Sequence, residues 1–400
     1  MQCKKVRNKN GFVWECVEDG PRLANGKRNQ IRRRGKTQRE ARMKVSDEIE
    51  RLEMQGINAR LSDTTTFEQL ADEWLKVYAA SGVKRGSVRI REKEVKVLNK
   101  HLAGVPVNKI THHMYQNVLF ELDDEEYAYN TISGVNTCAN MIFRYAKRNG
   151  LINDNPRDDA VIPKKSITVE ELENDNIEET YFETDELMDF LNITLTVGLE
   201  LDKEWFYTLA FSGMRPGELC ALKKSDLNFD NNTIRVSKTL YSENNNMREY
   251  TLDTTKTNTM RIVEMDNNIM SMLKQLIHNN DVHKLKYRTL IEDYNNEDFV
   301  FQRHNGYPFF IKNISDRMRR LLKFSGINKK LTPHSFRHTH ISMLTESGAE
   351  LPTIMERVGH VDPNTTLKVY THVTNKMKLK SVENLTTFNK ELLDKISFQK

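Results

Sequence analysis

The sequence predicts a multidomain α+β protein, in which a small three-stranded sheet with one helix precedes an all-helical domain and a mixed, mainly helical domain. Three observations predict this order. β-prone runs and one helical pattern come first, helical patterns alone fill the following segment, and both kinds of pattern mix after residue 180. A chain of 400 residues is long enough for two or three domains that each bury a core. We place these domains at residues 1–58, 64–162 and 175–395.

The first domain begins with β-prone runs at 12–17 and 29–36, which turn-forming residues separate. A helix follows, because Thr37 and Glu40 have the spacing of a capping box and apolar residues then recur at helical spacing up to Gly56. These patterns predict a small sheet packed on one helix.

Positive charge is concentrated in this first domain. Residues 1–44 contain 14 Lys and Arg and four acidic residues, a net charge of 14 − 4 = +10, whereas the whole chain carries +5 and the remainder +5 − 10 = −5. A basic arm on a mildly acidic body predicts a polyanionic partner. A strand that carries Arg32, Arg33 and Arg34 suits a DNA groove, and a solvated basic face is the alternative.

The second domain is predicted from helical patterns alone. They begin at Phe67, after a polar link, and continue at 83–102, 112–122 and 131–148. The pattern at 83–102 is strongly basic, so this helix could follow a phosphate backbone, although a solvated charged helix is the alternative. The side chains that would contact phosphates are Lys84, Arg85, Arg89 and Arg91.

A polar, acidic linker at 163–180 leads into the third domain, where helical and β-prone patterns mix. The helical patterns lie at 184–196, 202–211 and 216–223. The β-prone runs lie at 233–240, 260–265 and 298–302. After Lys376 a further helical pattern could pack on its own domain or on a neighbouring protomer.

Composition argues against membrane-spanning, secreted and metal-bound classes. No run of about 18 apolar residues could span a membrane, and the charged N-terminus lacks the apolar core of a secretory signal. We therefore expect a cytoplasmic protein. The cysteines lie apart without metal-ligand spacing, so we expect free thiols and no zinc site. These cysteines are Cys3, Cys16, Cys138 and Cys220.

The segment LTPHSFRHTH, residues 331–340, carries the strongest functional signal. It places His334 and Arg337 on one face of a short turn or helix. His360 follows in ERVGH, and Tyr370 lies 33 residues after Arg337. Arginine and histidine can hold a phosphodiester while a tyrosine hydroxyl attacks it. Clustered histidines could instead bind a metal, but HExxH is absent and the segment has no acidic or Cys ligand.

Arg215 and Lys256 extend this phosphate chemistry. Arg215 precedes a helical pattern in GMRPGEL, where its guanidinium can donate paired hydrogen bonds to phosphate oxygens. Lys256 lies in a turn between two β-prone runs in TKTNTMR, where its ammonium could protonate a leaving oxygen. A salt-bridged surface arginine and a solvated lysine are the alternatives that the local patterns leave open.

Together, these motifs resemble the catalytic residues of the tyrosine recombinases, the phage integrase family. The resemblance covers residues 180–375. By this resemblance, the first domain is an arm-binding domain, the second a core-binding domain and the third the catalytic domain. It rests on the order and context of Arg215, Lys256, His334, Arg337, His360 and Tyr370.

The resemblance implies a mechanism for strand transfer. Tyr370 attacks the scissile phosphate and forms a 3′-phosphotyrosine bond, while Lys256 protonates the leaving 5′-oxygen. The bond energy stays in the phosphotyrosine link, so the resemblance implies neither a metal nor ATP. Phosphate contacts and proton movement fall to Arg215, Arg337, His334 and His360.

The resemblance also implies partners and a biological role. These are double-stranded DNA attachment sites, a homotetramer on DNA, an excisionase and a host DNA-bending protein, for an integrase that inserts or excises a mobile element. The alternatives are a DNA-binding regulator that has lost catalysis, a Xer-type resolvase and a type IB topoisomerase. The basic arm favours the integrase over the resolvase.

Overall fold

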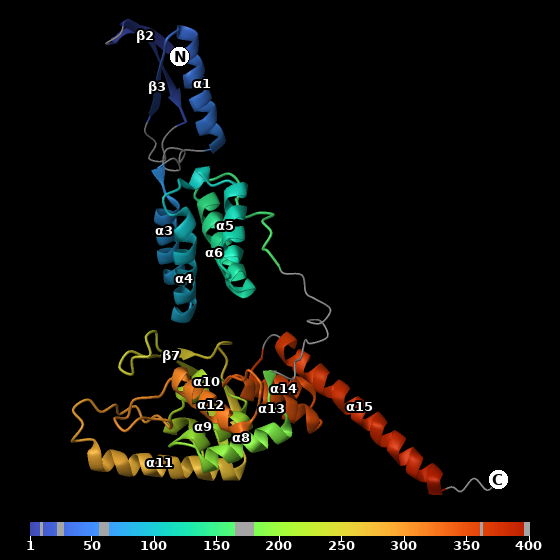
Figure 1. Ribbon diagram of the computed structural model, residues 1–400. Coiled ribbons are helices and arrows are strands. Elements are labelled where there is room, and N and C mark those ends of the chain that lie inside the picture. Colours follow the sequence, from blue (N-terminus) through green and yellow to red (C-terminus); the bar gives the residue numbers. More distant parts are fainter. Residues whose placement is uncertain (9–10, 22–27, 56–63, 165–179, 361–362, 396–400) are drawn as a thin grey trace, which may run out of the picture. The chain divides into compact units, whose positions relative to one another are not determined.

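The computed structural model describes residues 1–8, 11–21, 28–55, 64–164, 180–360 and 363–395 (Figure 1). The chain divides into two compact units, Met1–Ser166 and Ile167–Lys400. Separate clusters of buried hydrophobic residues form in the N-terminal sheet region, in the helical region that follows it and in the second unit. Among the described helices, none is long and apolar enough to cross a membrane.

The N-terminal region is a three-stranded antiparallel sheet packed on one helix, as predicted. The helix begins where the capping pattern indicates, because the Glu40 N–H donates to Oγ1 of Thr37 at 3.1 Å. The Glu40 carboxylate accepts from the Lys36 N–H at 2.8 Å, one residue before the expected partner. The elements are β1 (Gln2–Asn8), β2 (Gly11–Gly20), β3 (Asn29–Gly35) and α1 (Gln38–Gln55).

The expectation of four free thiols is wrong for one pair of cysteines. Cys3 and Cys16 lie directly opposite each other on β1 and β2, with Cα atoms 4.1 Å apart, and form a disulfide. The sequence patterns had not singled out β1, so the register that brings the two residues together was not foreseen. Cys138 and Cys220 are free and buried, and burial raises the pKa of each thiol to about 12.

The helical region contains the helices that the sequence predicts, with changes of two residues at three boundaries: the basic helix begins at Arg85, the helix that follows it ends at Asp124 and the last helix begins at Tyr129. Lys84 is therefore the N-cap residue of the basic helix. Thr66 and Thr111 cap the helices before and after it by accepting from backbone N–H groups. Aromatic rings of Phe67 and Tyr115 pack against Phe143, each at a centroid distance of 5.7 Å. The helices are α3 (Phe67–Ala80), α4 (Arg85–Leu102), α5 (His112–Asp124) and α6 (Tyr129–Arg148).

The second unit is mainly helical with two small sheets, which agrees with the predicted fold class. One sheet has the order β4-β5-β8 and the other is the hairpin β6-β7. The strands are β4 (Leu227–Asn228), β5 (Thr233–Val236), β6 (Lys238–Tyr241), β7 (Thr251–Thr254) and β8 (Arg261–Glu264). The helices are α8 (Thr184–Thr196), α9 (Asp202–Ser212), α10 (Pro216–Cys220), α11 (Asn267–Tyr287), α12 (Ile311–Ser325), α13 (Ser335–Glu346), α14 (Leu351–Val358) and α15 (Pro363–Lys395).

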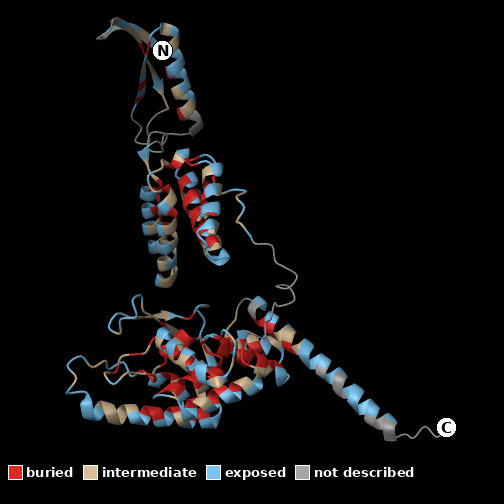
Figure 2. Cartoon of the chain, viewed as in Figure 1, coloured by how far each residue is buried: buried red, intermediate tan, exposed pale blue. Residues whose placement is uncertain are grey.

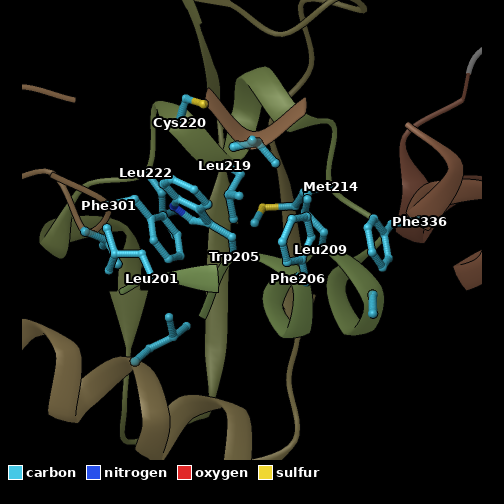
Figure 3. Packing of buried hydrophobic residues seen from close by; sticks show 14 of the residues in the cluster. Leu201, Trp205, Phe206, Leu209, Met214, Leu219, Cys220, Leu222, Phe301 and Phe336 are labelled. Atoms are coloured by element: carbon cyan, nitrogen blue, oxygen red, sulfur yellow. The ribbon is translucent and has the colours of Figure 1, made fainter. Parts of the chain in front are cut away.

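An aromatic core fixes α13, the helix that carries the HSFR motif. The Phe336 ring lies 5.1 Å from that of Phe182 and 5.5 Å from that of Phe206. Figure 3 shows Phe336 facing the side chains of α9, among them Phe206 and Leu209. Because Phe336 is fully buried, its burial orients the neighbouring Arg337 on the same helix.

Three expectations for this unit need correction. Residues 298–302 do not form a strand: Phe299, Val300 and Phe301 are all buried, and the segment makes only isolated bridges. A run buried on every side lacks the alternation of a half-exposed strand. The run 233–240 is divided between β5 and β6, which belong to different sheets, and the helix expected at 216–223 ends at Cys220.

Helix α15 begins before the segment in which a tail helix was expected. It runs from Pro363 and includes Tyr370, so the nucleophile candidate and the tail share one helix. Its first part packs on α13 and α14, whereas its later part extends from the domain (Figure 1) and is coloured as exposed in Figure 2. The later part exposes the apolar side chains Met377, Leu379, Val382, Leu385, Phe388 and Leu393; the Leu392 side chain lies outside the described residues.

Candidate active site

Arg337 is the buried centre of the site. Its side chain has no solvent exposure. Nη1 donates to the carbonyl oxygen of Gly213 at 2.9 Å, and Nε donates to Nε2 of His360 at 3.1 Å. Nη2 is buried and has no hydrogen-bond partner among the described residues. Burial and the nearby charge of Arg215 lower the pKa of Arg337, as expected for a cation that lacks a facing anion.

Gly213 makes the contact with Arg337 possible. It ends α9 with φ of 63°, a left-handed conformation that glycine adopts without steric cost. A Cβ atom at this position would lie 2.6 Å from Cδ2 of His340. The turn therefore brings a backbone carbonyl oxygen to the buried guanidinium and leaves no room for a larger residue.

Arg215 lies at the N-terminus of α10, where Pro216 occupies the first helical position. Its Nη1 donates to Oε1 of Glu218 at 2.9 Å, and its Nη2 donates to the carbonyl oxygen of Gly359 at 3.3 Å. Burial alone would raise the pKa of Glu218, but hydrogen bonds from Arg261 and the Arg215 backbone hold it below its usual value. Glu218 therefore stays ionised and holds Arg215 at the edge of the site.

The hydrogen bonds of His360 define its tautomer. Arginine can only donate, so Nε2 of His360 accepts from Arg337, and the proton of the neutral ring resides on Nδ1. Nδ1 then donates to Oγ1 of the buried Thr366. Burial and the charges of Arg337 and Arg215 lower the pKa of His360 to about 3. The ring is therefore neutral at physiological pH and braces Arg337.

His334 and Lys256 reach the same cluster from two other segments. His334 is the exposed N-cap of α13, and desolvation, followed by the charges of His338 and Arg337, lowers its pKa. The charge of Lys256 acts on His334 in the same direction, so Lys256 lies within electrostatic range. Lys256 is exposed in the turn between β7 and β8, which the Asn258 N–H closes by donating to the Thr255 carbonyl at 2.9 Å.

Tyr370 approaches from helix α15. Its ring is half-buried and packs against the cluster of Ile341, Ile354 and Val358, which joins α13, α14 and α15. Within the described residues, no hydrogen bond joins its hydroxyl to the five cationic or imidazole groups. A hydrogen bond thus joins Arg337 to His360, and another joins Arg215 to the turn before His360. His334 and Lys256 are related to this group by charge, and Tyr370 is held by packing on α13 and α14.

The three arginines of strand β3 do not face the same way. Arg32 and Arg34 are exposed on the open face of the sheet, where the buried Glu15 of β2 lies between them. Arg34 is bonded to Glu15 at 2.8 Å. Arg33 lies on the opposite face and pairs with Glu48 of α1 at 2.9 Å. Alternation along a strand produces this division, and the sequence run alone hid it.

The basic residues of α4 also differ in their surroundings. Arg85 is exposed, and Lys84 and Arg89 are partly so. Arg91 instead donates to Glu94 at 2.5 Å and to the carbonyl oxygen of Gly134 on α6 at 3.4 Å. These contacts favour a structural role for Arg91, while the other three remain candidates for phosphate contact.

Sequence reasoning gave no role to several residues around the site. Glu218 stands three residues after Arg215, a capping-box spacing that could have marked it. Arg261 and Arg357 had no such signal, because their partners lie on distant segments. His340 was named only for a rival metal site, and no group of three or more ligand-type side chains suited to a metal occurs in the described chain.

Residues 180–377 match the phage integrase family. The integrase of Staphylococcus phage L54a is 31% identical over 330 residues, which are 78% of this chain and 90% of that protein. The Tn1549 transposon integrase in complex with transposon right end DNA has a TM-score of 0.62 at 21% identity, covering 80% of this chain and 100% of that chain. A lambda integrase tetramer bound to a Holliday junction has a TM-score of 0.57 at 16% identity, covering 91% and 94%.

The family match and the phage relative place the chain in the tyrosine recombinase class of enzymes. The chain belongs to the phage integrase family and is a site-specific DNA recombinase, an integrase. The two solved structures share its fold at low identity.

The stability of this unit should depend on pH through His340. Burial and the charge of Arg357 lower the pKa of His340 to about 4. Its Nε2 accepts from Arg357 at 3.0 Å, and its Nδ1 lies 2.9 Å from the Ala210 carbonyl oxygen. An unfolded histidine has a pKa of about 6.5, so the unfolded chain binds more protons below that pH and stability falls toward pH 4.

Hydrogen exchange of the α13 amides in the full chain measures this effect. Between pH 7 and pH 5, the free energy of opening of these amides in the wild type should fall by about 2 kcal/mol through His340 alone. This free energy is obtained from the exchange rates after correction for intrinsic exchange. His340→Gln should lose that part of the pH dependence. An unchanged pH dependence in the variant would contradict the role of His340.

Proposed function

We propose that this integrase cleaves DNA with Tyr370 as nucleophile, at a phosphate held by Arg337 and Arg215. The observation that carries the proposal is the buried guanidinium of Arg337, whose Nη2 has no partner among the described residues. A buried donor without a partner is costly, and a charged one more so. A non-bridging phosphate oxygen would supply both the missing acceptor and the missing negative charge.

The reaction proposed is a transfer of one phosphodiester bond. The Tyr370 hydroxyl gives its proton to water or to a neighbouring base and attacks phosphorus, the bond between phosphorus and the 5′-oxygen breaks, and a 3′-phosphotyrosine link forms. The ammonium of Lys256 gives the leaving 5′-oxygen its proton. A 5′-hydroxyl from another DNA strand then attacks the link and reverses each transfer, so no external energy source is needed.

The remaining groups support the charge that develops on phosphate. Arg215 and Arg337 donate to the non-bridging oxygens, each donor contributing roughly 3 kcal/mol when it is preorganised. His360 is neutral with its proton on Nδ1, so it braces Arg337 rather than adding charge. His334, exposed beside the cluster, can contact phosphate and accept or donate a proton.

We propose that the N-terminal sheet region binds arm-type DNA sites and that the helical region binds core sites. The open face of the sheet carries the exposed Arg32 and Arg34, and α4 presents Lys84, Arg85 and Arg89. The presence of this N-terminal sheet region favours the function of an integrase over that of a Xer-type resolvase. The domains would then lie at 1–58, 64–162 and 175–395.

The two faces of β3 allow a direct test of arm binding. Arg32→Ala with Arg34→Ala should weaken binding of the full chain to a duplex from the flank of its own gene. The slope of log affinity against log salt should become less steep by about 1–2, because each lost phosphate contact releases about one fewer counterion. Arg33→Ala is the matched control and should leave the slope unchanged, because Arg33 lies on the opposite face of the sheet, against Glu48 of α1, whereas Arg32 and Arg34 lie on the open face. A change in slope as large in the control would contradict this assignment.

Assembly is proposed as a homotetramer on DNA, in which the exposed apolar side chains of the later part of α15 contact a neighbouring protomer. Lambda integrase forms a tetramer on a Holliday junction with the same fold. The six exposed apolar residues described on the later part of α15 favour burial of this part in an assembly. An excisionase and a host DNA-bending protein are further proposed partners for excision and for DNA shaping.

The function is tested by trapping the covalent intermediate. The full chain is incubated with duplexes that flank its own gene, and protein–DNA adducts that resist SDS are digested and sequenced by mass spectrometry. We expect the nucleotide on the peptide that contains Tyr370. Binding without any adduct on these duplexes would instead favour a regulator on a recombinase scaffold, and a nucleotide on another residue would contradict the assignment of Tyr370.

A further inference from the structure

The buried carboxylate of Glu218 serves two arginines, and only one of them faces the phosphate site. Oε1 accepts from Nη1 of Arg215 at 2.9 Å. Arg261, on β8, approaches from the other side, with Nη2 2.7 Å from Oε2 and Nη1 3.3 Å from Oε1. Glu218 is 2% exposed, so solvent screens neither interaction strongly.

Arg261 also fastens the turn that carries His360. Its Nε donates to the carbonyl oxygen of Arg357 at 3.1 Å, and the Arg357 side chain returns a bond of 2.7 Å to the carbonyl oxygen of Glu264 on the same strand as Arg261. Gly359 lies against the Arg261 side chain with φ of 69°, and a Cβ atom there would lie 3.2 Å from it. Strand β8 and the end of α14 are therefore joined by two reciprocal arginine–carbonyl bonds.

These contacts join two parts of the proposed active site to one guanidinium, and the chain itself places a third part next to Arg261. Glu218 connects Arg261 to Arg215, and the Arg357 carbonyl connects it to the turn before His360. Along the chain, Arg261 directly follows the turn that carries Lys256. A shift of this one side chain would change the positions of groups that lie far apart in the sequence.

The charge of Arg261 has a second consequence for Arg215. A buried carboxylate beside Arg215 competes with phosphate for its guanidinium, because both anions use the same donors. With Arg261 present, Glu218 is already neutralised by a bidentate partner. Without it, Arg215 would be the only remaining counterion among the residues that contact Glu218 in the described structure, and it would be drawn toward the carboxylate.

We infer that Arg261 is a positioning residue of the recombinase, which neutralises Glu218 and thereby weakens its hold on Arg215, so that the remaining N–H groups of Arg215 can donate to the scissile phosphate. The inference rests on the proposed function, because it assumes that Arg215 binds phosphate. Arg261 itself touches no reacting atom. Its effect on cleavage passes through Glu218 and through the turn before His360.

Variants that remove or keep the positive charge of Arg261 test this inference. The full chain and its variants are assayed for single-turnover adduct formation on a nicked duplex on which the wild type forms the adduct, with affinity for the same DNA measured in parallel. Arg261→Met should slow adduct formation roughly 100-fold, the scale of one lost preorganised donor, and leave affinity within about 3-fold. Arg261→Lys keeps the charge and should retain most of the rate.

The double variant separates charge balance from simple support. Glu218→Gln alone should slow adduct formation about 10-fold, since Arg215 loses its charged anchor. Combined with Arg261→Met, it removes the carboxylate that competes for Arg215, so the double variant should be at least about 10-fold faster than Arg261→Met alone. A double variant as slow as Arg261→Met, or slower, would overturn the inference in favour of a purely structural role.

Arg235 provides the matched control. It lies on β5, which pairs with β8, and its guanidinium contacts the buried Asp226 at 3.2 Å, away from Arg215. Arg235→Met should leave adduct formation within about 3-fold. If Arg261→Met also behaves in this way, the inference is overturned while the function stands. If the wild type forms no adduct on any duplex, the proposed function itself fails.

Discussion

Tyr370→Phe should abolish the covalent DNA adduct and recombination while DNA affinity stays within about twofold. The change removes only the hydroxyl, and enzymes that lose their nucleophile fall by factors on the order of 10⁴ to 10⁶. The ring packs against Ile341, Ile354 and Val358, and phenylalanine preserves that packing. Gel analysis after SDS treatment and filter binding measure the two quantities on the same duplex.

Tyr181 supplies the control for this prediction. It belongs to the same hydrophobic cluster as Tyr370 and is 2% exposed, so it is the neighbouring tyrosine most similar in surroundings. Tyr181→Phe should still form the adduct. An adduct that persists in Tyr370→Phe, and disappears only in the Tyr181 variant, would reassign the nucleophile.

The helices with a clear apolar period were predictable from the sequence, and the short strands were less so. The helix expected at 184–196 has those bounds in the structure, because its apolar residues recur at helical spacing along one face from the start of the segment to its end. Strands β5 and β6 are each four residues long, too short for a pattern that shows which sheet each one joins. Helices α11, α12 and α14 were not singled out either, and the segment at 298–302 was misassigned because its apolar run is buried on all sides.

The residues of the site were predictable by resemblance, but the contacts that position them were not. The bond from Arg261 to Glu218 spans 43 residues, and that from Arg215 to the Gly359 carbonyl spans 144. Such contacts depend on how strands and helices pack, which no local pattern reports. The hydrogen bond between Arg337 and His360, which fixes the tautomer of His360, is of the same kind.

Arg337→Lys should reduce adduct formation by about 10³-fold or more with little loss of DNA affinity. The guanidinium of Arg337 contacts Gly213 and His360 at once and keeps Nη2 available. A lysine ammonium is a point charge on a flexible chain and cannot hold this planar arrangement. Each lost preorganised donor accounts for roughly 3 kcal/mol of transition-state stabilisation, so the loss of more than one donor exceeds a factor of 10³.

Arg337→Ala should lose still more activity and should also destabilise the domain. Its removal leaves the Gly213 carbonyl and Nε2 of His360 without a donor in a buried position, at about 1–3 kcal/mol for each unsatisfied group. Hydrogen exchange of the α9 and α13 amides would show this loss of protection, which Arg337→Lys should show only in part. The two variants therefore separate support of the fold from support of the reaction.

Arg317→Lys is the control for the loss of adduct formation expected in Arg337→Lys. Arg317 contacts the buried Asp202 at 3.0 Å, so it is also an arginine with a buried partner, but it belongs to no group of the proposed site. If Arg317→Lys slowed adduct formation as much as Arg337→Lys, the loss would reflect general weakening of the unit. If only the Arg337 variant is slow, and its α13 amides keep their protection, the missing function is the donation of hydrogen bonds to phosphate. The buried, unpartnered Nη2 of Arg337 would then be explained by the oxygen that it receives during strand transfer.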